Sequence, residues 1–532
     1  MLLTRFTMLG LCIVSAVVSG FYFPTPWSIP VLVVSSALSL LGLYDLAQPL
    51  HSVRRNYPIV GHLRWFFEEV RPELRQYLIE GDNDKVPFSR SQRSLVYARS
   101  KNESSDRAFG TLVDVYQTGY EFIAHSTRPA NPADPATFRT PIGGQGGAEP
   151  YMASIFNISA MSFGSLSANA IRALNRGAKL GGFAHDTGEG AISTYHREHG
   201  GDLIWEIGSG YFGCRTADGR FDPVRFAEQS ADPQIKMIEI KLSQGAKPGH
   251  GGILPGEKVT AEIAITRGVP VGKDCISPAR HREFSTPIEL MQFVALMRKL
   301  ANGKPVGFKL CVGQPWEFMG MVKAMRETGI YPDFIVVDGA EGGTGAAPVE
   351  FADNLGMPMR ESLLFVHNTL VGAGLRSKIK VGAAGKIVSA FDIAAVLALG
   401  ADWTNAGRGF MFALGCIQSL SCHTNRCPVG VATQDPMRQR ALVVPDKADR
   451  VHSFHRNTMK ALAEMTAAAG LTHPSQLGPH HLVRRVSMTE IRLFSQLHIF
   501  LEDGELLSGT HNRDFYSAAW NLARPDSFEL SS

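Results

Sequence analysis

Residues 334–348, FIVVDGAEGGTGAAP, decide the fold. The stretch begins with a short apolar run that ends at Asp338, and a glycine-rich turn follows. A buried strand that leads through such a turn into a helical segment is the repeating unit of α/β proteins. From about residue 150 to residue 430 the unit recurs eight times, which matches a (β/α)8 TIM barrel. The same pattern leaves a doubly wound open sheet as the alternative.

The eight candidate strands are short apolar runs, each followed by a turn. They are Ser154–Ile158, Gly182–His185, Ile235–Leu242, Val271–Ile276, Val306–Cys311, Phe334–Asp338, Ile379–Ala383 and Trp403–Ala406. Because barrel active sites lie at the carboxyl ends of the strands, the loops after these runs are the candidate site. Glycine-rich loops let the backbone approach a phosphorylated ligand, and Arg408 after the eighth strand can add a bidentate contact. The pattern therefore predicts a phosphorylated cofactor.

A second glycine motif lies at residues 208–213, GSGYFG, and formally fits GxGxxG, with Asp232 about 20 residues further on. A dinucleotide site needs a helix directly after this turn. Residues 216–223 carry turn signals instead of helical periodicity. We therefore predict no NAD site here.

The N-terminal segment has no Asp, Glu, Lys or Arg from Phe6 to Tyr44. Prolines divide it into two apolar runs, residues 6–23 and 28–44, each near the length that crosses a bilayer. Arg5 precedes the first run and Arg54 follows the second, so the positive-inside rule places both ends in the cytoplasm. We expect a transmembrane helical hairpin in the inner (cytoplasmic) membrane; a cleaved signal peptide is the alternative.

The chain is expected to contain four parts. Residues 1–50 form the transmembrane hairpin, 51–139 a helical lead-in and linker, 140–470 the barrel, and 471–532 a C-terminal extension. Within the lead-in, His62–Glu80 has apolar residues at helical spacing, with Pro72 as a point of bending. Charged residues make up only 19% of the chain, and the net charge of +4 is dispersed, which excludes a nucleic-acid surface.

Three of the seven cysteines are concentrated in GCIQSLSCHTNRCP, residues 415–428. Cys416, Cys422 and Cys427 form a C-x5-C-x4-C pattern, and three thiolates suit an iron–sulfur centre with one corner lacking iron, a 3Fe-4S cluster. A Cys3His zinc site with His423 as fourth ligand is the alternative. A cytosolic location disfavours disulfides.

These residues together resemble the FMN-binding synthase domain of glutamate synthase. The similarity runs from about Ile158 to Gln434. It is carried by ISAMSFGSLS (158–167), TGEGA (187–191), QGAKPGHGGILPGEKV (244–259), ISP (276–278), DGAEGGTGAAP (338–348), HNTLVGAGLR (367–376) and GCIQSLSCHTNRCPVGVATQ (415–434). With its apolar N-terminus and RNYPIVGHLR (55–64), the whole chain resembles the shorter bacterial FMN-binding glutamate synthase family proteins.

The resemblance implies FMN at the strand ends with the cluster beside it, and a hydride transfer to the imine of 2-oxoglutarate and ammonia. By resemblance Cys416, Cys422 and Cys427 are the cluster ligands. The residues expected around FMN are Met161, Ser162, Gln244, Lys309, Gly343, Thr344, Gly345, Gly385, Gly407 and Arg408. A cation such as Lys309 favours reduced flavin, which carries negative charge. Glu189 and Lys247 are expected to orient a substrate carboxylate or relay a proton.

Three departures from the family pattern bear on the activity. The chain begins with the apolar segment instead of an amidotransferase domain, so ammonia is expected from elsewhere. The family's V-K-L-V-S-E-x-G becomes FKLCVGQP at residues 308–315, and the Ser–Glu pair near the substrate is lost. About 100 residues follow Gln434, and no NAD(P)H or FAD domain is visible. We therefore expect a separate electron donor or acceptor, a protein such as ferredoxin or the quinone pool.

The sequence thus predicts a membrane-anchored, cytosol-facing oxidoreductase with FMN and a 3Fe-4S cluster, active on a small amino acid or 2-oxo acid. One alternative is an FMN dehydrogenase for another small acid or amine that passes electrons to ferredoxin or quinone. The other is a non-catalytic scaffold that keeps the barrel without turnover. Production of glutamate from 2-oxoglutarate and ammonia would distinguish the predicted enzyme from the FMN dehydrogenase. A protein that binds no cofactor would favour the scaffold.

Overall fold

The computed structural model describes residues 5–84, 87–508 and 514–530. The chain divides into two compact units between Arg90 and Ser91. The helices of the first unit are α1 (Thr7–Phe21), α2 (Ser28–Ala47), α3 (Ser52–Asn56), α4 (Gly61–Leu74) and the π-helical turn η1 (Arg75–Ile79).

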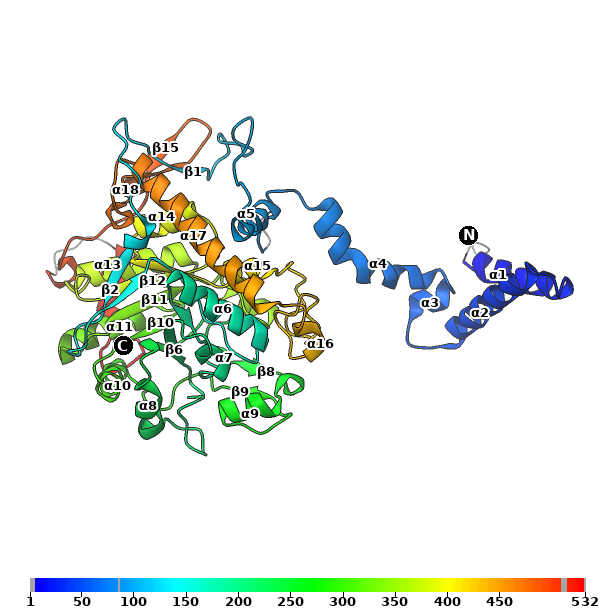
Figure 1. Ribbon diagram of the computed structural model, residues 1–532, viewed down its shortest axis with the longest axis horizontal. Coiled ribbons are helices and arrows are strands. Elements are labelled where there is room, and N and C mark those ends of the chain that lie inside the picture. The colour runs from blue at the N-terminus through cyan, green and yellow to red at the C-terminus, as the bar shows by residue number, and fades with distance from the viewer. Residues whose placement is uncertain (1–4, 85–86, 509–513, 531–532) are drawn as a thin grey trace. The chain divides into compact units, whose positions relative to one another are not determined.

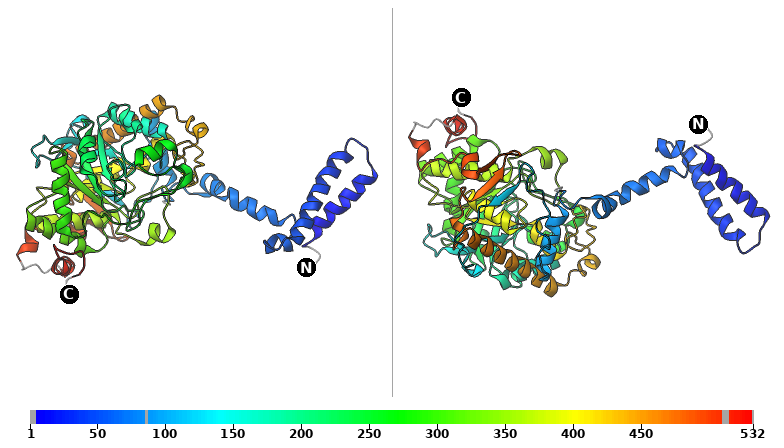
Figure 2. Two further views of the ribbon diagram at one scale, coloured as in Figure 1. Left: turned by 90° about the horizontal axis from the view of Figure 1, so that it is seen from below. Right: turned by 90° about the horizontal axis from the view of Figure 1, so that it is seen from above.

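Helices α1 and α2 pack side by side as a hairpin (Figure 2). Small residues on α2 permit the close approach: a Cβ on Gly42 would lie 2.6 Å from Leu9 Cδ1. Among the described helices, only α2 has the length and hydropathy of a membrane span. Helix α1 has 15 residues, about 23 Å, which is short of a hydrocarbon core of about 30 Å. Length and composition thus support one span of the two expected.

The lead-in helix is present as α4 and η1, and Pro72 lies inside α4 near the change to the π-helical turn. The N-terminal end of α4 contacts α2 of the hairpin. Buried Asp45 on α2 accepts a hydrogen bond from the Ile59 N–H, and its carboxylate lies 2.9 Å from His62 Nε2. The apolar side of α4 is exposed, with Phe66 at 55% and Phe67 at 56%. This face carries apolar surface that the rest of the first unit does not cover.

The second unit is built on a closed barrel of eight parallel strands surrounded by helices (Figure 1). The strands are β4 (Phe156–Ile158), β5 (His185–Asp186), β6 (Leu203–Ile207), β7 (Ile235–Lys241), β10 (Val306–Leu310), β11 (Phe334–Asp338), β12 (Lys380–Ala384) and β13 (Trp403–Ala406). They neighbour one another in chain order, and β13 pairs with β4 to close the ring. The predicted (β/α)8 barrel is confirmed, and the open sheet is excluded.

Several helices of this unit begin or end at standard capping residues. Thr286 with Glu289, and Ser389 with Asp392, form capping boxes, while Gly329 ends a helix in the left-handed conformation. The helices are α6 (Ala168–Gly181), α7 (Thr194–Arg197), α8 (Pro223–Ser230), α9 (Ala261–Arg267), α10 (Pro287–Leu300), α11 (Pro315–Thr328), α12 (Val349–Asn354), α13 (Met359–Gly372), α14 (Ala390–Ala398), α15 (Arg408–Leu414), α16 (Pro436–Gln439) and α17 (Val444–Ala468).

The segments before and after the barrel belong to the same compact unit. They contain α5 (Arg90–Lys101), β1 (Glu121–Ile123), β14 (Leu482–Arg485), β15 (Ile491–Leu493), α18 (Phe494–Leu497) and α19 (Asp514–Leu522). Strand β1 pairs with β14, and Glu121 forms ion pairs with Arg360 and Arg484 at 2.6 Å each. Two further antiparallel strand pairs are β2 (Arg139–Ile142) with β3 (Tyr151–Ser154), and β8 (Ile253–Leu254) with β9 (Cys275–Ile276).

One predicted barrel strand is wrong. Residues 271–276 contribute only β9, which pairs antiparallel with β8 outside the barrel. The third barrel strand is instead β6, LIWEI, all five residues of which are buried. The apolar run of β6 is only five residues long and includes the charged Glu206, whereas β7, which also contains charged residues, is seven residues long and was predicted. No helix directly follows β6: the next helix, α8, begins at Pro223. The glycine motif at residues 208–213 therefore lacks the helix that a dinucleotide site requires, as the sequence predicted.

Candidate active site

The loops after the strands bring together several residues predicted to surround FMN. Gln244 Nε2 lies 3.5 Å from Thr344 Oγ1, and Arg408 Nη2 donates to the Thr344 carbonyl oxygen at 2.5 Å. A Cβ on Gly343 would lie 2.6 Å from Arg408 Nε. The loops after β7, β11 and β13 are therefore in contact. Because Gly343 has no side chain, the Arg408 guanidinium can lie directly against its backbone.

Next to the loop after β13, the loop after β4 carries Met161 and Ser162. Met161 is buried, its N–H donates to the Asp186 carbonyl oxygen, and its Cε would lie 3.4 Å from a Cβ on Gly407. Ser162 Oγ donates to Ser165 Oγ at 2.9 Å. Met161 and Gly407 thus join the first and eighth strand ends, where the sequence predicted one continuous cofactor site.

The remaining predicted glycines occupy the same set of loops. Gly385 follows β12, the seventh barrel strand, and a Cβ there would lie 2.8 Å from Met359 Cβ. A Cβ on Gly345 would meet nothing within 4 Å. Barrels commonly hold phosphate at the seventh and eighth strand ends, so Gly385, Gly407 and Arg408 occupy positions that fit an FMN phosphate.

Glu189 lies in the loop after β5 and has a partner that the sequence did not indicate. Lys241 Nζ is 3.3 Å from Glu189 Oε2, and Ser277 Oγ donates to the same oxygen at 3.4 Å. Burial raises the pKa of Glu189, but the charges of Lys241, Arg267 and Lys247 outweigh it and hold this pKa below its usual value. Glu189 is thus an anion in a cationic surrounding.

Lys247 is buried, and burial lowers the pKa of its ammonium group, which the charge of Glu189 partly offsets. The two residues predicted to handle the substrate therefore interact electrostatically. Lys241 Nζ also donates to Gln244 Oε1 at 2.7 Å. Lys241 consequently connects the candidate substrate residue Glu189 with the candidate flavin residue Gln244.

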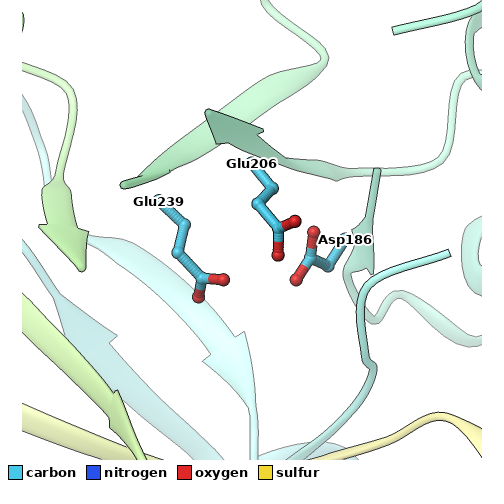
Figure 3. A group of neighbouring side chains, drawn as sticks. All are labelled: Asp186, Glu206 and Glu239. Atoms are coloured by element: carbon cyan, nitrogen blue, oxygen red, sulfur yellow. The ribbon is translucent and has the colours of Figure 1, made fainter. Parts of the chain in front are cut away.

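Lys309 lies inside the barrel, enclosed by acidic side chains. Its Nζ forms ion pairs with Glu206, with Glu239 at 3.0 Å and with Asp186 at 3.7 Å. Figure 3 shows the three carboxylates pointing toward one another. All four side chains are at most 4% exposed. The sequence reasoning missed these acids, although a charged residue within each of the apolar runs LIWEI and IKMIEIK was the available signal.

The cysteine loop follows α15. The Gln418 N–H donates to Cys416 Sγ at 3.5 Å, and Tyr97 Oη on α5 donates to the Cys416 carbonyl oxygen at 2.6 Å. Burial raises the pKa of the Cys416 thiol to about 11. Gln418, Leu420 and Asn425 all have positive φ, an uncommon conformation that is often found at functional sites.

Lys258 is a buried cation beside the cysteine loop, and its surroundings bear on whether this loop fits an anionic cluster. Its side chain is 3% exposed and its Nζ donates to the carbonyl oxygens of Cys422 and Ala432, at 2.8 and 3.3 Å. Among the described residues it has no carboxylate ion pair. Burial lowers the pKa of Lys258, and the thiols of Cys422 and Cys427 oppose this. Because a buried cation without an anion is unfavourable, bound thiolates fit this position.

Arg408 connects the two halves of the site. In addition to the Thr344 carbonyl oxygen, it reaches Cys422 Sγ, 3.9 Å from its Nη1. One side chain therefore contacts both the glycine-rich loop after β11 and the cysteine loop. The geometry is that of a closed barrel whose glycine-rich loops lie next to a loop with three cysteines.

The chain belongs to the glutamate synthase family: the family model described as the conserved region in glutamate synthase matches residues 140–472. The chain is accordingly a glutamate synthase-type oxidoreductase, of the class that acts on CH–NH2 donors. The glutamate synthase large subunit-like protein YerD of Bacillus subtilis is 39% identical over 481 residues, which cover 83% of this chain and 91% of YerD.

An archaeal-type glutamate synthase (NADPH) of Thermotoga neapolitana is 35% identical over 341 residues, 63% of each chain. The present chain therefore spans less than two thirds of that enzyme. Among solved structures, a double mutant of flavocytochrome b2 with pyruvate bound is similar with a TM-score of 0.42 and 13% identity, over 88% of this chain and 94% of that one.

Proposed function

We propose that the protein binds FMN in the loops after β4, β7, β11, β12 and β13 and a 3Fe-4S cluster on Cys416, Cys422 and Cys427. At the flavin it reduces the imine of a small 2-oxo acid and ammonia, or oxidises the corresponding amino acid. The observation that carries this proposal is Arg408, which contacts both the Thr344 loop and Cys422. A cation between the two loops suits two redox groups that exchange electrons.

The thiol geometry favours a cluster over a single zinc ion. A zinc ion with bonds of about 2.3 Å needs its sulfur ligands within about 4 Å of one another. Among the described residues, carboxylate oxygens of Asp186, Glu206 and Glu239 lie within 4.8 Å of one another, whereas the sulfur atoms of Cys416, Cys422 and Cys427 do not form such a close group. A centre with several irons spaces its thiolates more widely. Lys258 then serves as counter-charge to the thiolates.

The residues of the chain have separate roles in this proposal. FMN, when bound, supplies hydride transfer. Arg408 and the glycines of the seventh and eighth strand ends hold its phosphate, and Lys247 binds the carboxylate of the substrate. Glu189, an anion between Lys241 and Ser277, attracts the ammonium or iminium nitrogen and exchanges a proton with it. Lys247 and Ser277 are buried and the side chain of Glu189 is 19% exposed, so access of water to this part of the site is limited.

Anaerobic purification in mild detergent, with flavin, iron and sulfide measured on one sample, tests the cofactors. We expect FMN and about three irons per chain, and a 3Fe-4S signal in the EPR spectrum of the oxidised protein. Turnover with 2-oxoglutarate, ammonia and an artificial reductant then tests the reaction, which should yield glutamate. Zinc without flavin would contradict the redox proposal and favour a scaffold.

The loop after β10 favours a second candidate substrate class. Residues 311–315 lack the Ser–Glu pair of the family, and the Cys311 N–H is instead bonded to Ser243 Oγ at 2.9 Å, while a Cβ on Gly313 would meet nothing within 4 Å. A site that is more open here accommodates an acid or amine other than glutamate. Flavin reduction by a panel of small amino and hydroxy acids, without formation of glutamate, would favour a dehydrogenase that passes electrons to ferredoxin or quinone.

For location, we propose attachment of the first unit to the cytoplasmic membrane, with the barrel in the cytoplasm. Support comes from the apolar α2, from the exposed apolar face of α4 and from the absence of Lys and Arg between Phe6 and Tyr44. Membrane attachment suits an exchange of electrons with the quinone pool or a membrane-bound partner.

A further inference from the structure

The barrel interior has a charged layer between an apolar layer and the loops. On neighbouring strands Ile204 pairs with Met237, Glu206 with Glu239, and Lys241 with Lys309. Because inward positions recur at every second residue, these pairs form three successive layers along the barrel axis. TIM barrels usually fill such layers with branched apolar side chains. Two glutamates, followed by two lysines nearer the loops, therefore require a separate explanation.

Glu206 is the acid that both lysines share. It forms an ion pair with Lys309, and its Oε1 lies 4.0 Å from Lys241 Nζ. Lys241 in turn contacts Glu189 and Gln244 in the loops above. A continuous series of charged groups thus extends from the barrel core to the candidate flavin and substrate residues, and Glu206 lies at its centre.

The charges of the inner group do not balance. Asp186, Glu206 and Glu239 lie around one ammonium group, that of Lys309, and each is at most 1% exposed. Asp338 on β11 acts electrostatically on Glu239, and Lys241 Nζ lies 4.0 Å from Glu206 Oε1. Three carboxylates with one lysine leave two uncompensated negative charges in a buried space, and the excess stays at two when Asp338 and Lys241 are counted as well, which is strongly unfavourable. A shared proton removes part of this excess.

A metal ion is a less suitable compensation. The three acids have the spacing of a metal site, but Lys309 Nζ is already within 3.0 Å of Glu239 and 3.7 Å of Asp186. An ion would have to displace the ammonium group. We name the group of Asp186, Glu206, Glu239 and Lys309 the lysine cage.

We propose that Glu206 is a positioning residue: it holds Lys309 in a proton-sharing lysine cage beneath the flavin, and the charge of this cage sets how readily the flavin is reduced. The inference rests on the proposed FMN site. Lys309 acts on the flavin as part of a group whose net charge is negative or neutral, and not as an isolated cation. A carboxylate removed from the cage leaves more positive charge below the flavin and stabilises its reduced, anionic form.

The test compares the flavin equilibrium in FMN-loaded variants at a fixed redox poise. Glu206→Gln should raise the ratio of reduced to oxidised flavin about tenfold, and Glu206→Asp should restore the wild-type ratio. The double variant Glu206→Gln/Lys309→Met, which loses one charge of each sign, should return close to wild type. Glu464→Gln, a remote exposed position on α17, is the control for net charge.

Folded, FMN-loaded Glu206→Gln with an unchanged ratio would overturn the inference, and so would a double variant that keeps the full shift. The proton is tested separately in the flavin-free protein, where the infrared band of a protonated carboxylic acid should be present and should be lost in Glu239→Gln. If that band is absent, the lysine cage is contradicted. A wild-type protein that binds no FMN would contradict the proposed function, whereas the infrared result concerns the cage alone.

Discussion

Lys258 and Lys309 are both buried lysines of the second unit, but their surroundings are opposite. Lys309 is enclosed by three carboxylates, which outweigh the effect of burial and raise its pKa well above the ordinary value. Lys258 donates to two backbone carbonyl oxygens beside the cysteine loop, and burial lowers its pKa. The contrast indicates that Lys309 has its anions within the chain, while Lys258 is placed for an anion that binds.

Replacement of Lys258 by Met should therefore weaken the cluster. We expect at least a several-fold loss of iron and sulfide per chain with FMN content retained, because the counter-charge of the thiolates is gone. Lys304→Met is the matched control, since Lys304 also donates to two carbonyl oxygens, those of Ser230 and Asp232, away from the cysteines. Equal iron loss in the two variants would mean that Lys258 has only a structural role.

Cys422→Ser tests the ligand assignment directly. The EPR signal of the cluster should disappear and iron should fall, while FMN remains bound, because the hydroxyl is a poor substitute for a thiolate ligand. Cys214→Ala serves as a control, since Cys214 is buried in the barrel unit away from the C-x5-C-x4-C loop. Normal iron and sulfide in Cys422→Ser would refute the assignment.

The stability of the protein should depend on pH through Glu239. Burial raises the pKa of Glu239 to about 7, from an ordinary value of 4.5. The folded state then binds a proton more tightly than the unfolded state, so stability falls as pH rises between these two values, by up to about 3 kcal/mol. Glu239→Gln should flatten this fall. The measurement is the guanidinium midpoint from about pH 5 to pH 8; parallel curves for variant and wild type would contradict the expectation.

Among the elements, seven of the eight barrel strands were predictable because they are apolar and end at glycine or polar turns. Strand β6 was not predicted, although its neighbour β7 carries Glu239 at the position paired with Glu206 and was predicted. Residues 271–276 were predicted in its place, but they form β9, which pairs antiparallel with β8 outside the barrel and exposes Ile276. The cysteine loop and the glycine-rich loops could be predicted because each is a local sequence motif. The lysine cage was not, because its members come from four strands and meet only when the barrel closes.

Contact between the loops after β7 and β11 should be required for FMN retention. The Gly245 N–H donates to Asp338 Oδ2 at 2.8 Å, and a Cβ on Gly245 would collide with the carbonyl oxygen of Gly339. Gly245→Ala should force the two loops apart and weaken FMN binding at least tenfold. Gly313→Ala, where a Cβ meets nothing within 4 Å, is the control. Equal FMN affinity in both variants, measured by fluorescence titration, would exclude a tight loop contact.

For the whole molecule, the first unit should determine its location. In fractionated cells the protein should stay in the membrane pellet after alkaline carbonate extraction, because α2 is apolar over a length that spans the bilayer. Leu40→Arg, at a position on α2 that is 69% exposed, should release a large fraction of the protein. The control Leu296→Arg lies on α10 of the second unit, is 43% exposed, and should not. Complete release of the wild type by carbonate would contradict membrane insertion.

The contacts of Arg408 with the Thr344 loop and with Cys422 have a thermodynamic consequence. If both proposed cofactors are bound, a single guanidinium group interacts with each, and a change in the charge of one alters the energy of adding an electron to the other. Such linkage is reciprocal: the amount by which a reduced cluster disfavours flavin reduction equals the amount by which a reduced flavin disfavours cluster reduction. Removal of the Arg408 charge would change both midpoints together.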